Sequence, residues 1–113
     1  MKLWIDDVRL APKGYIWCRS VNDTIELIKK IEHRNAFYTI HTSEGITEDK
    51  EIELIDIDHD AGEYAQYGGD YIKLLDWLEE TNRNYPIRIH SMNPVGVANM
   101  RAIIERNGWK EVR

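Results

Sequence analysis

Three apolar segments of this 113-residue chain end abruptly in side chains that can bind ligands or move protons. The segments are residues 3–5, 55–57 and 87–89. The side chains that follow them are, in chain order, Asp6 and Asp7, then Asp58, His59 and Asp60, then His90, Ser91 and Asn93. In an open parallel α/β sheet, the carboxyl ends of neighbouring strands share one edge, and ligands bind outside that edge. We therefore expect the three segments to form one site.

The carboxylates of the first two segments suggest a cation site. Asp6 and Asp7 are adjacent at the end of a buried strand, where two negative charges are costly unless a cation or hydrogen-bond donors neutralise them. With Asp58 or Asp60 they would form the oxygen-rich site that suits Mg²⁺ or Mn²⁺. The alternative is that Asp7 caps the following turn and Asp6 faces water. The predicted metal ligands are Asp6, Asp7, Asp58 and Asp60.

The third segment suggests a phosphate site at the start of a helix. Asn93 precedes Pro94, and a capping side chain followed by proline is typical of a helix N-terminus. Free N–H groups and the positive end of the helix dipole attract anions there. The predicted phosphate ligands are Arg9, Ser91, Asn93 and the amides of Val95 and Gly96. Arg9 is equally compatible with a surface ion pair.

The two histidines at the strand ends are candidates for proton transfer. Histidine has the side chain whose unperturbed pKa lies nearest neutrality, so His59 and His90 facing one phosphate would form an acid/base pair. The alternative is that either ring is a hydrogen-bonded structural residue. The predicted catalytic residues are His59, His90 and Asp58. Asp56 lies deeper in its strand and is interpreted as structural, bonded to a neighbouring strand or helix terminus.

Composition limits the classes of protein to consider. Hydrophobic residues make up 42% and charged residues 31% of the chain, which is ordinary for one soluble globular domain over residues 1–113. No apolar run could span a membrane, and a cytoplasmic location is the expectation. A net charge of −5 argues against an extended nucleic-acid surface, but a small phosphorylated ligand or an RNA end remains open as a partner. The single cysteine, Cys18, excludes an internal disulfide and a cysteine-based zinc site.

The elements that must position these side chains alternate along the chain. We predict strands over residues 2–5, 15–19, 36–41, 51–57, 87–90 and 109–112. Helices are expected after Ser20, ending near residues 33–35, after Asp70 as the cap, and after Asn93, ending at Gly108. Residues 6–14 contain proline and glycine and should form a loop. The polar turn near residues 43–50 suggests a β-hairpin insertion. The predicted fold is a three-layer α/β sandwich, flavodoxin-like and mostly parallel, with one helix missing.

The motifs of this chain resemble those of the cyclic-phosphate processing receiver-like domain. They are DDVR with a nearby AP, then DHDxG, then a Gly-Asp helix start, then HSxNP followed by Val and Gly. The resemblance covers nearly the whole chain, and it departs from the family pattern at Ala61 and in the predicted hairpin. It implies a fold derived from the two-component receiver domain. It also implies a site made of Asp6, Asp7, Arg9, Asp58, His59, Asp60, His90, Ser91 and Asn93.

The resemblance and the strand ends together suggest a metal-assisted phosphoesterase acting on a cyclic phosphate. The substrate class would be a nucleotide, an RNA end or an ADP-ribose-type product. One alternative is a signalling receiver in which Asp58 accepts a phosphoryl group. Such a receiver needs a lysine at the end of its last strand, and the only lysine nearby in sequence is Lys110. A further alternative is a phosphate-binding module without catalysis.

Overall fold

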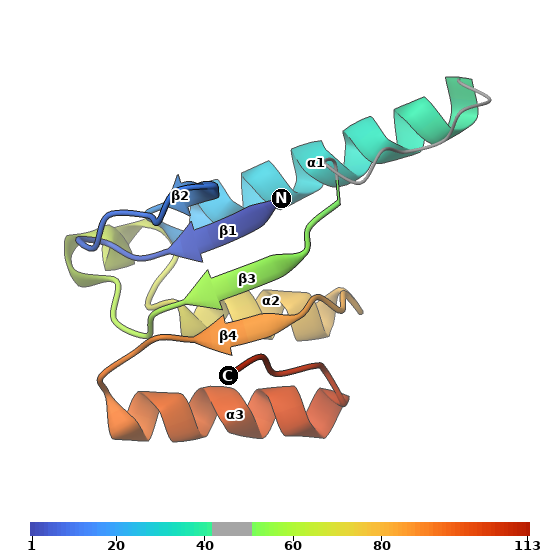
Figure 1. Cartoon of the computed structure of the whole chain (residues 1–113). Coiled ribbons are helices and arrows are strands. Elements are labelled where there is room, and N and C mark those ends of the chain that lie inside the picture. Colours follow the sequence, from blue (N-terminus) through green and yellow to red (C-terminus); the bar gives the residue numbers. More distant parts are fainter. Residues whose placement is uncertain (42–50) are drawn as a thin grey trace.

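The computed structural model describes the backbone of residues 1–41 and 51–113 and the side chains of residues 1–34 and 51–113. Strands and helices alternate along the chain (Figure 1). They are β1 (Lys2–Ile5), β2 (Tyr15–Cys18), α1 (Val21–His41), β3 (Leu54–Ile57), the 3-10 helix η2 (Gly62–Tyr67), α2 (Ile72–Glu80), β4 (Ile87–Ile89) and α3 (Pro94–Asn107).

The four strands form one sheet in the order β2-β1-β3-β4, and every neighbouring pair is parallel. The predicted parallel, receiver-like α/β fold is therefore confirmed. The register places Trp4 beside Trp17 on one side and beside Asp56 on the other. Asp56 in turn lies beside Arg88. Because all four strands run in one direction, their carboxyl ends meet at a single edge of the sheet.

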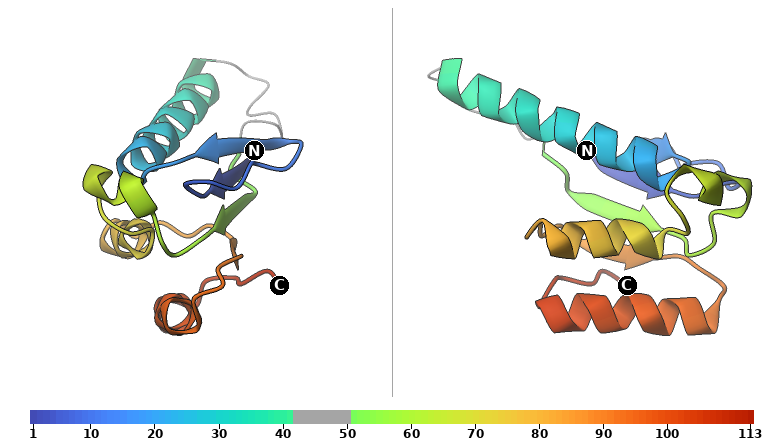
Figure 2. Two further views of the ribbon diagram at one scale, coloured as in Figure 1. Left: turned by 90° about the vertical axis from the view of Figure 1, so that its left-hand side faces the viewer. Right: turned by 180° about the vertical axis from the view of Figure 1, so that it is seen from behind.

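The three α-helices cover one face of this sheet, which makes two layers rather than the predicted three (Figure 2). The strand order explains the difference. The chain passes from β2 to β3, from β3 to β4 and then beyond β4, always toward the β4 edge of the sheet. Because crossovers between parallel strands are right-handed, connections that run in the same direction place their helices on the same face. The reverse step, from β1 to β2, is a loop over residues 6–14, as predicted, and supplies no helix to the other face.

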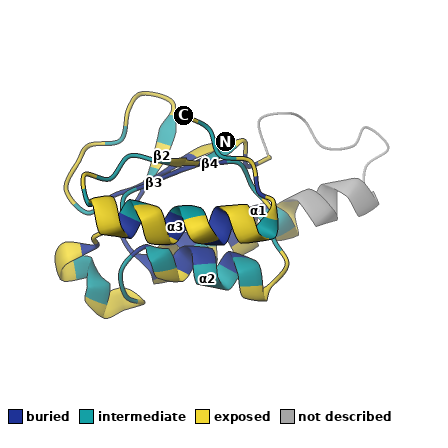
Figure 3. Ribbon diagram, turned by 90° about the horizontal axis from the view of Figure 1, so that it is seen from below, coloured by how far each residue is buried: buried dark blue, intermediate teal, exposed yellow. Residues whose placement is uncertain are grey.

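The hydrophobic core lies between the sheet and this helical layer. Strand side chains such as Leu3, Ile5 and Ile55 are fully buried against side chains of the helices. The helices contact one another side by side, α1 against α2 and α2 against α3. Figure 3 shows α2 and α3 from below: buried positions alternate with exposed ones along α3 and mainly with intermediate ones along α2. Within the described residues, no helix is long and apolar enough to cross a membrane.

Helix α1 is longer than predicted. It continues through residues 36–41, so the predicted strand there is wrong, as is the predicted helix end near residues 33–35. The β-forming residues of this segment misled the prediction, but neither proline nor glycine interrupts the sequence between Val21 and His41. The predicted turn near residues 43–50 lies outside the described residues. The following strand, predicted over residues 51–57, is limited to β3.

Two of the three predicted helix caps are confirmed. The Ser20 hydroxyl accepts a hydrogen bond from the amide of Asp23 at 3.1 Å. The side-chain oxygen of Asn93 accepts one from the amide of Gly96 at 3.0 Å, and α3 then ends at Gly108 with φ of 67°. The predicted cap at Asp70 is wrong, because its carboxylate accepts the amide of Ala61 at 3.0 Å and so holds the loop that follows β3.

The chain returns to the sheet after α3 but forms hardly any strand there. The predicted strand over residues 109–112 is reduced to one parallel bridge between Ile87 and Glu111. Its two backbone hydrogen bonds join the amide of Ile87 to the carbonyl of Lys110, and the amide of Val112 to the carbonyl of Ile87. Since Ile87 is the first residue of β4, this bridge lies at the end of β4 opposite to His90.

Candidate functional site

Three of the predicted side chains converge at the carboxyl edge of the sheet. Asp6 follows β1, Asp58 follows β3 and His90 follows β4. One ligand atom from each of these residues lies within 4.8 Å of the others, a spacing that could hold a metal ion. We call these three residues the acidic centre. The convergence expected from the parallel strands is therefore present in the structure.

His90 is held on all sides of its ring. Its Nε2 lies 2.9 Å from Oδ2 of Asp6, and its Nδ1 lies 2.7 Å from Oδ1 of Asp56. The ring is stacked on Trp4 with the centroids 3.9 Å apart and the planes 3° from parallel. Trp4 is itself fixed by a hydrogen bond from its indole nitrogen to the carbonyl of Arg9. This packing fixes the ring of His90 in the orientation in which its Nε2 faces Asp6.

Asp56 is the residue that orients His90, a role that the sequence did not reveal. Its side chain is fully buried, and its second oxygen accepts a hydrogen bond from Arg88 at 3.0 Å. The interpretation of Asp56 as structural and bonded to a neighbouring strand agrees with these contacts, since both partners belong to β4 or follow it directly. A carboxylate behind a histidine fixes the tautomer and the orientation of the ring.

Asp6 is fully buried but well supplied with donors. Its Oδ1 accepts the amides of Val8 and Arg9, both at 2.9 Å. Burial by itself would raise the pKa of the Asp6 carboxyl, but these two amides together with His90 outweigh it, so the pKa lies below its ordinary value. Asp6 is therefore a stable carboxylate inside the protein rather than the water-facing residue of the alternative interpretation.

Asp7 has the opposite electrostatic setting. Burial, followed by the negative charges of Asp6 and Asp58, raises the pKa of the Asp7 carboxyl. Its Oδ2 lies against Gly62, where an added Cβ would come within 2.4 Å of that oxygen. Gly62 also has a φ of 54°, which disfavours other residues. Asp7 thus borders the acidic centre but contributes no ligand atom to the group of three.

His59 lies at the same edge but in different surroundings. Its ring packs on Gly96 in the first turn of α3, where a Cβ on the glycine would come within 2.4 Å of Cγ of His59. Its Nδ1 lies 2.9 Å from Oδ1 of Asp60, an exposed carboxylate that also approaches Asn93 at 3.4 Å. Asp60 therefore orients His59. The group of three that could hold a cation does not include Asp60, whose predicted role as a metal ligand stays a prediction.

The predicted phosphate ligands are mostly engaged with one another. The amide of Gly96 donates to Asn93, and the amide of Asn93 donates to the Ser91 hydroxyl at 3.1 Å. Arg9 reaches across the sheet edge and donates from Nη1 to the carbonyl of His90 at 3.1 Å. Val95 is 71% exposed on the first turn of α3. Arg9 is thus placed beside the acidic centre, whereas the Gly96 amide is satisfied within the protein.

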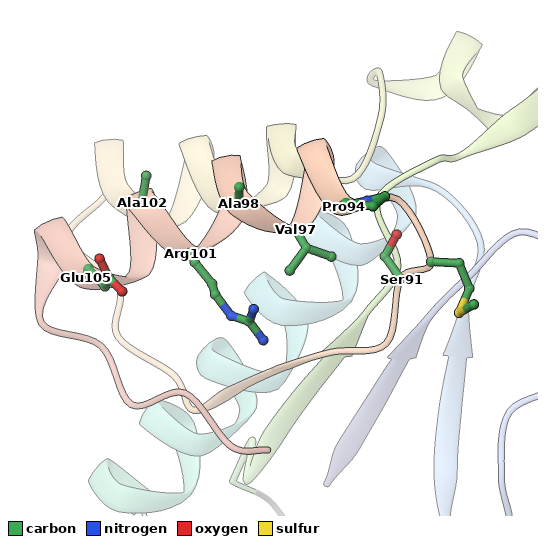
Figure 4. A pocket seen from close by; sticks show the side chains of 8 residues that line it. Ser91, Pro94, Val97, Ala98, Arg101, Ala102 and Glu105 are labelled. Carbon is green, nitrogen blue, oxygen red and sulfur yellow. The ribbon is translucent and has the colours of Figure 1, made fainter.

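A hollow of about 630 Å³ lies on the outer side of α3, beside the acidic centre rather than over it. Ser91, Met92 and Pro94 form its near end, and Arg101 and Glu105 its far end. Figure 4 shows the side chain of Arg101 extending away from α3. The guanidinium of Arg101 is paired with Glu111 at 2.9 Å. Because none of the residues of the acidic centre lines this hollow, we locate the chemistry at the strand ends.

A comparison with protein families matches nearly the whole chain. The sequence model of the cyclic-phosphate processing receiver domain matches residues 1–106 of the 113. That range includes every residue of the acidic centre and the first helical turn against which His59 packs. Searches of curated proteins and of solved structures found no match. The chain belongs to the cyclic-phosphate processing receiver domain family.

Proposed function

We propose that this protein is a phosphoesterase that opens a cyclic phosphate at the carboxyl edge of its sheet. The observation that carries the proposal is the convergence of Asp6, Asp58 and His90, with Asp56 fixing the ring of His90 from behind. Family membership supports the cyclic phosphate as the group acted upon. The substrate class is a nucleotide, an RNA end or an ADP-ribose-type product.

The donor set suits a divalent cation. Two carboxylates and one imidazole are ligands that Mn²⁺ accepts, and Mg²⁺ is compatible with the carboxylates. The hydrogen bond from Nδ1 of His90 to Asp56 leaves Nε2 pointing at Asp6, which is the arrangement of many histidine ligands in metal sites. A cation held by Asp6, Asp58 and His90 would supply positive charge that polarises the phosphoryl group.

The side chains around the acidic centre would transfer the proton and bind the phosphate. Asp60 holds Nδ1 of His59, and no described residue is bonded to its Nε2, which is therefore the nitrogen that exchanges a proton with the substrate. Arg9 presents a guanidinium to the same edge and binds the anionic phosphate. In the reaction, the oxygen of water bonds to phosphorus, one ring P–O bond breaks, and a proton from the water is delivered to the leaving oxygen.

The surroundings of Lys110 weigh against the alternative of a phosphoacceptor receiver. A receiver needs a lysine beside its acidic pocket, but the Lys110 backbone is bonded to Ile87, at the end of β4 opposite to His90. Incubation with acetyl phosphate, followed by intact mass measurement, tests this alternative directly. A stable adduct on Asp58 would favour the receiver over the phosphoesterase.

Turnover of defined substrates tests the proposal. Purified protein with Mg²⁺ or Mn²⁺ should convert a nucleoside 2′,3′-cyclic phosphate, or an ADP-ribose-type cyclic phosphate, into the phosphomonoester, followed by ³¹P NMR. His59→Gln should lower kcat by about 10²–10⁴-fold, the usual contribution of a general acid or base. Arg106→Gln, a change at the far end of α3, is the matched control and should leave kcat unchanged.

Two results would contradict the proposal. If the full panel of cyclic phosphates is bound but left intact with either metal, the protein is a binding module without catalysis. If turnover occurs but His59→Gln retains full activity, the proton-transfer role of His59 is wrong and only the role of the acidic centre stands.

A further inference from the structure

Arg9 and Arg19 differ from the other arginines whose contacts are described. Five arginines form ion pairs with carboxylates, namely Arg83, Arg88, Arg101, Arg106 and Arg113. Arg9 and Arg19 form none with any carboxylate of the described residues. Arg9 belongs to the loop that follows β1, and Arg19 directly follows β2. Their positive charges are thus available to an anion from outside the protein.

Arg19 is nevertheless held in a defined position. Its guanidinium carbon lies 4.0 Å from the ring centre of Trp17 and 5.8 Å from that of Tyr64. Its Nη1 donates a hydrogen bond to the Tyr64 hydroxyl at 3.1 Å, and its backbone carbonyl accepts one from the buried Tyr71 at 2.7 Å. Stacking on an aromatic ring fixes the plane of a guanidinium and leaves its other N–H donors to bind a ligand.

Arg19 lies next to the acidic centre on the side away from Arg9. It follows Cys18, the last residue of β2, whose carbonyl accepts the amide of Asp6 at 3.2 Å. The indole nitrogen of Trp17 donates to the carbonyl of Asp6 at 2.8 Å. Neighbouring strands lie about 4.8 Å apart, so the backbone of Arg19 is one strand spacing from Asp6. Arg9 approaches from the β4 side, through the carbonyl of His90.

From this placement we infer that Arg19 binds a second phosphate group of the substrate. The inference rests on the proposed function, in which the acidic centre and Arg9 take the cyclic phosphate. The Arg19 guanidinium is stacked on Trp17, whose indole nitrogen is bonded to the Asp6 carbonyl, and it therefore suits a neighbouring phosphate of the same molecule. It can bind such a phosphate with two parallel hydrogen bonds. The substrate would therefore carry at least two phosphates, either a cyclic phosphate next to a phosphodiester or one joined to a pyrophosphate.

Binding of ligands that cannot be hydrolysed as cyclic esters tests this inference independently of turnover. The probes are adenosine 3′-phosphate with one phosphate, a diadenosine 3′-phosphate that adds a phosphodiester, and an ADP-ribose phosphate that adds a pyrophosphate. Isothermal titration in Mg²⁺ should show at least one of the two larger probes binding about tenfold more tightly than the mononucleotide, the size expected of a charge-assisted hydrogen bond. The larger probe with the stronger gain identifies the source of the second phosphate.

Substitution of Arg19 separates its role from a general effect of charge. Arg19→Gln should remove most of this tenfold gain and change the affinity for adenosine 3′-phosphate by less than about twofold. Arg106→Gln removes one positive charge at the far end of α3 and should change neither affinity. Tyr64→Phe, which removes the hydroxyl that holds Nη1, should lose about threefold of the gain while the melting temperature stays close to that of the wild type.

Several outcomes would overturn the inference. One is that Arg19→Gln loses the same affinity for the mononucleotide as for the larger probes. The others are that the wild type shows no preference for the larger probes, or that it binds none of the probes. The proposed function can fail separately. If a larger probe binds in a way that depends on Arg19 but the cyclic form of that molecule is not hydrolysed, the inference stands and the proposed function is wrong. If the wild type and Arg19→Gln hydrolyse both a dinucleotide cyclic phosphate and a cyclic phosphate of ADP-ribose with equal kcat/KM, the proposed function stands and the inference is wrong.

Discussion

At the scale of single residues, the site depends on how one histidine ring is held. His90 has a carboxylate at each nitrogen and an indole beneath its face. Asp6 belongs to the acidic centre, whereas Asp56 is fully buried and, among the described residues, its carboxylate is bonded only to His90 and Arg88. Asp56 therefore acts through His90 and not on the substrate, which makes it a positioning residue.

Replacing the Asp56 carboxylate should weaken cation binding without removing any ligand. Asp56→Asn should reduce the affinity for Mn²⁺ by about 10–100-fold, the usual effect of changing the residue that orients a histidine ligand. Titration followed by electron paramagnetic resonance of free Mn²⁺ measures this affinity. Asp60→Asn is the matched control, because Asp60 is exposed and bonded to His59. The affinity of this variant for Mn²⁺ should match that of the wild type. A larger loss in Asp60→Asn than in Asp56→Asn would show that the cation site lies nearer His59.

At the scale of elements, a polar contact through Glu32 joins the long helix α1 to the loop between α2 and β4. The Glu32 carboxylate accepts hydrogen bonds from Nη2 of Arg83 at 2.8 Å and from Nε of Arg83 at 3.0 Å and 3.1 Å, and it also accepts one from the Tyr85 hydroxyl. Burial alone would raise the pKa of Glu32, but these hydrogen bonds from Arg83 and Tyr85 lower it below its ordinary 4.5. Since the loop that joins α2 to β4 carries both partners, this contact fixes α1 against that loop.

The lowered pKa of Glu32 gives this contact a defined pH dependence. A carboxyl with a lower pKa in the folded state than in the unfolded state stabilises the fold above the unfolded value, and this contribution is lost as the pH falls through the folded value. Urea denaturation should show that Glu32→Gln costs about 1–2 kcal/mol at about pH 6 and less at about pH 3. Glu26→Gln, an exposed change on the same helix, should show little difference at either pH. An equal cost of Glu32→Gln at both values would mean that packing, not charge, holds α1 there.

At the scale of the whole molecule, the fold gathers negative charge at one edge of a protein whose net charge is −5. Asp6, Asp7 and Asp58 converge there, and the pKa of Asp7 is raised by burial and by the other two charges. Any cation that binds only the folded chain then increases its stability by mass action. Arg9 and the backbone of Arg19 border this edge from opposite sides, so under the proposed function an anionic substrate would meet positive charge beside the acids.

A divalent cation should therefore raise the melting temperature of the intact chain. Mn²⁺ at 100 times its dissociation constant adds about 2.7 kcal/mol to the free energy of unfolding, which corresponds to a shift of roughly 10 °C for a domain of this size. Scanning calorimetry with and without Mn²⁺ measures the shift, and NaCl at equal ionic strength should not reproduce it. Asp6→Asn should show little shift between its own metal-free and metal-containing scans. The same shift in Asp6→Asn as in the wild type would place the cation elsewhere.

The sequence by itself determined that the polar strand ends would meet. Short apolar runs separated by helical segments imply parallel strands, and the carboxyl ends of parallel strands share an edge whatever the details of packing. The caps at Ser20 and Asn93 were predictable for a similar reason, because each depends on a few consecutive residues. The resemblance to the receiver-like family rested on the same local motifs.

Only the tertiary structure decided which of these side chains act together. Asp56 orients His90 because the register places β3 beside β4. Asp60 is hydrogen-bonded to His59 because the chain turns after Asp58. The two-layer architecture depends on strand order, since right-handed crossovers that all move one way put every helix on one face. Contacts between strands and the direction of crossovers are relations between segments far apart in the sequence. Local propensity and residue spacing therefore do not predict them.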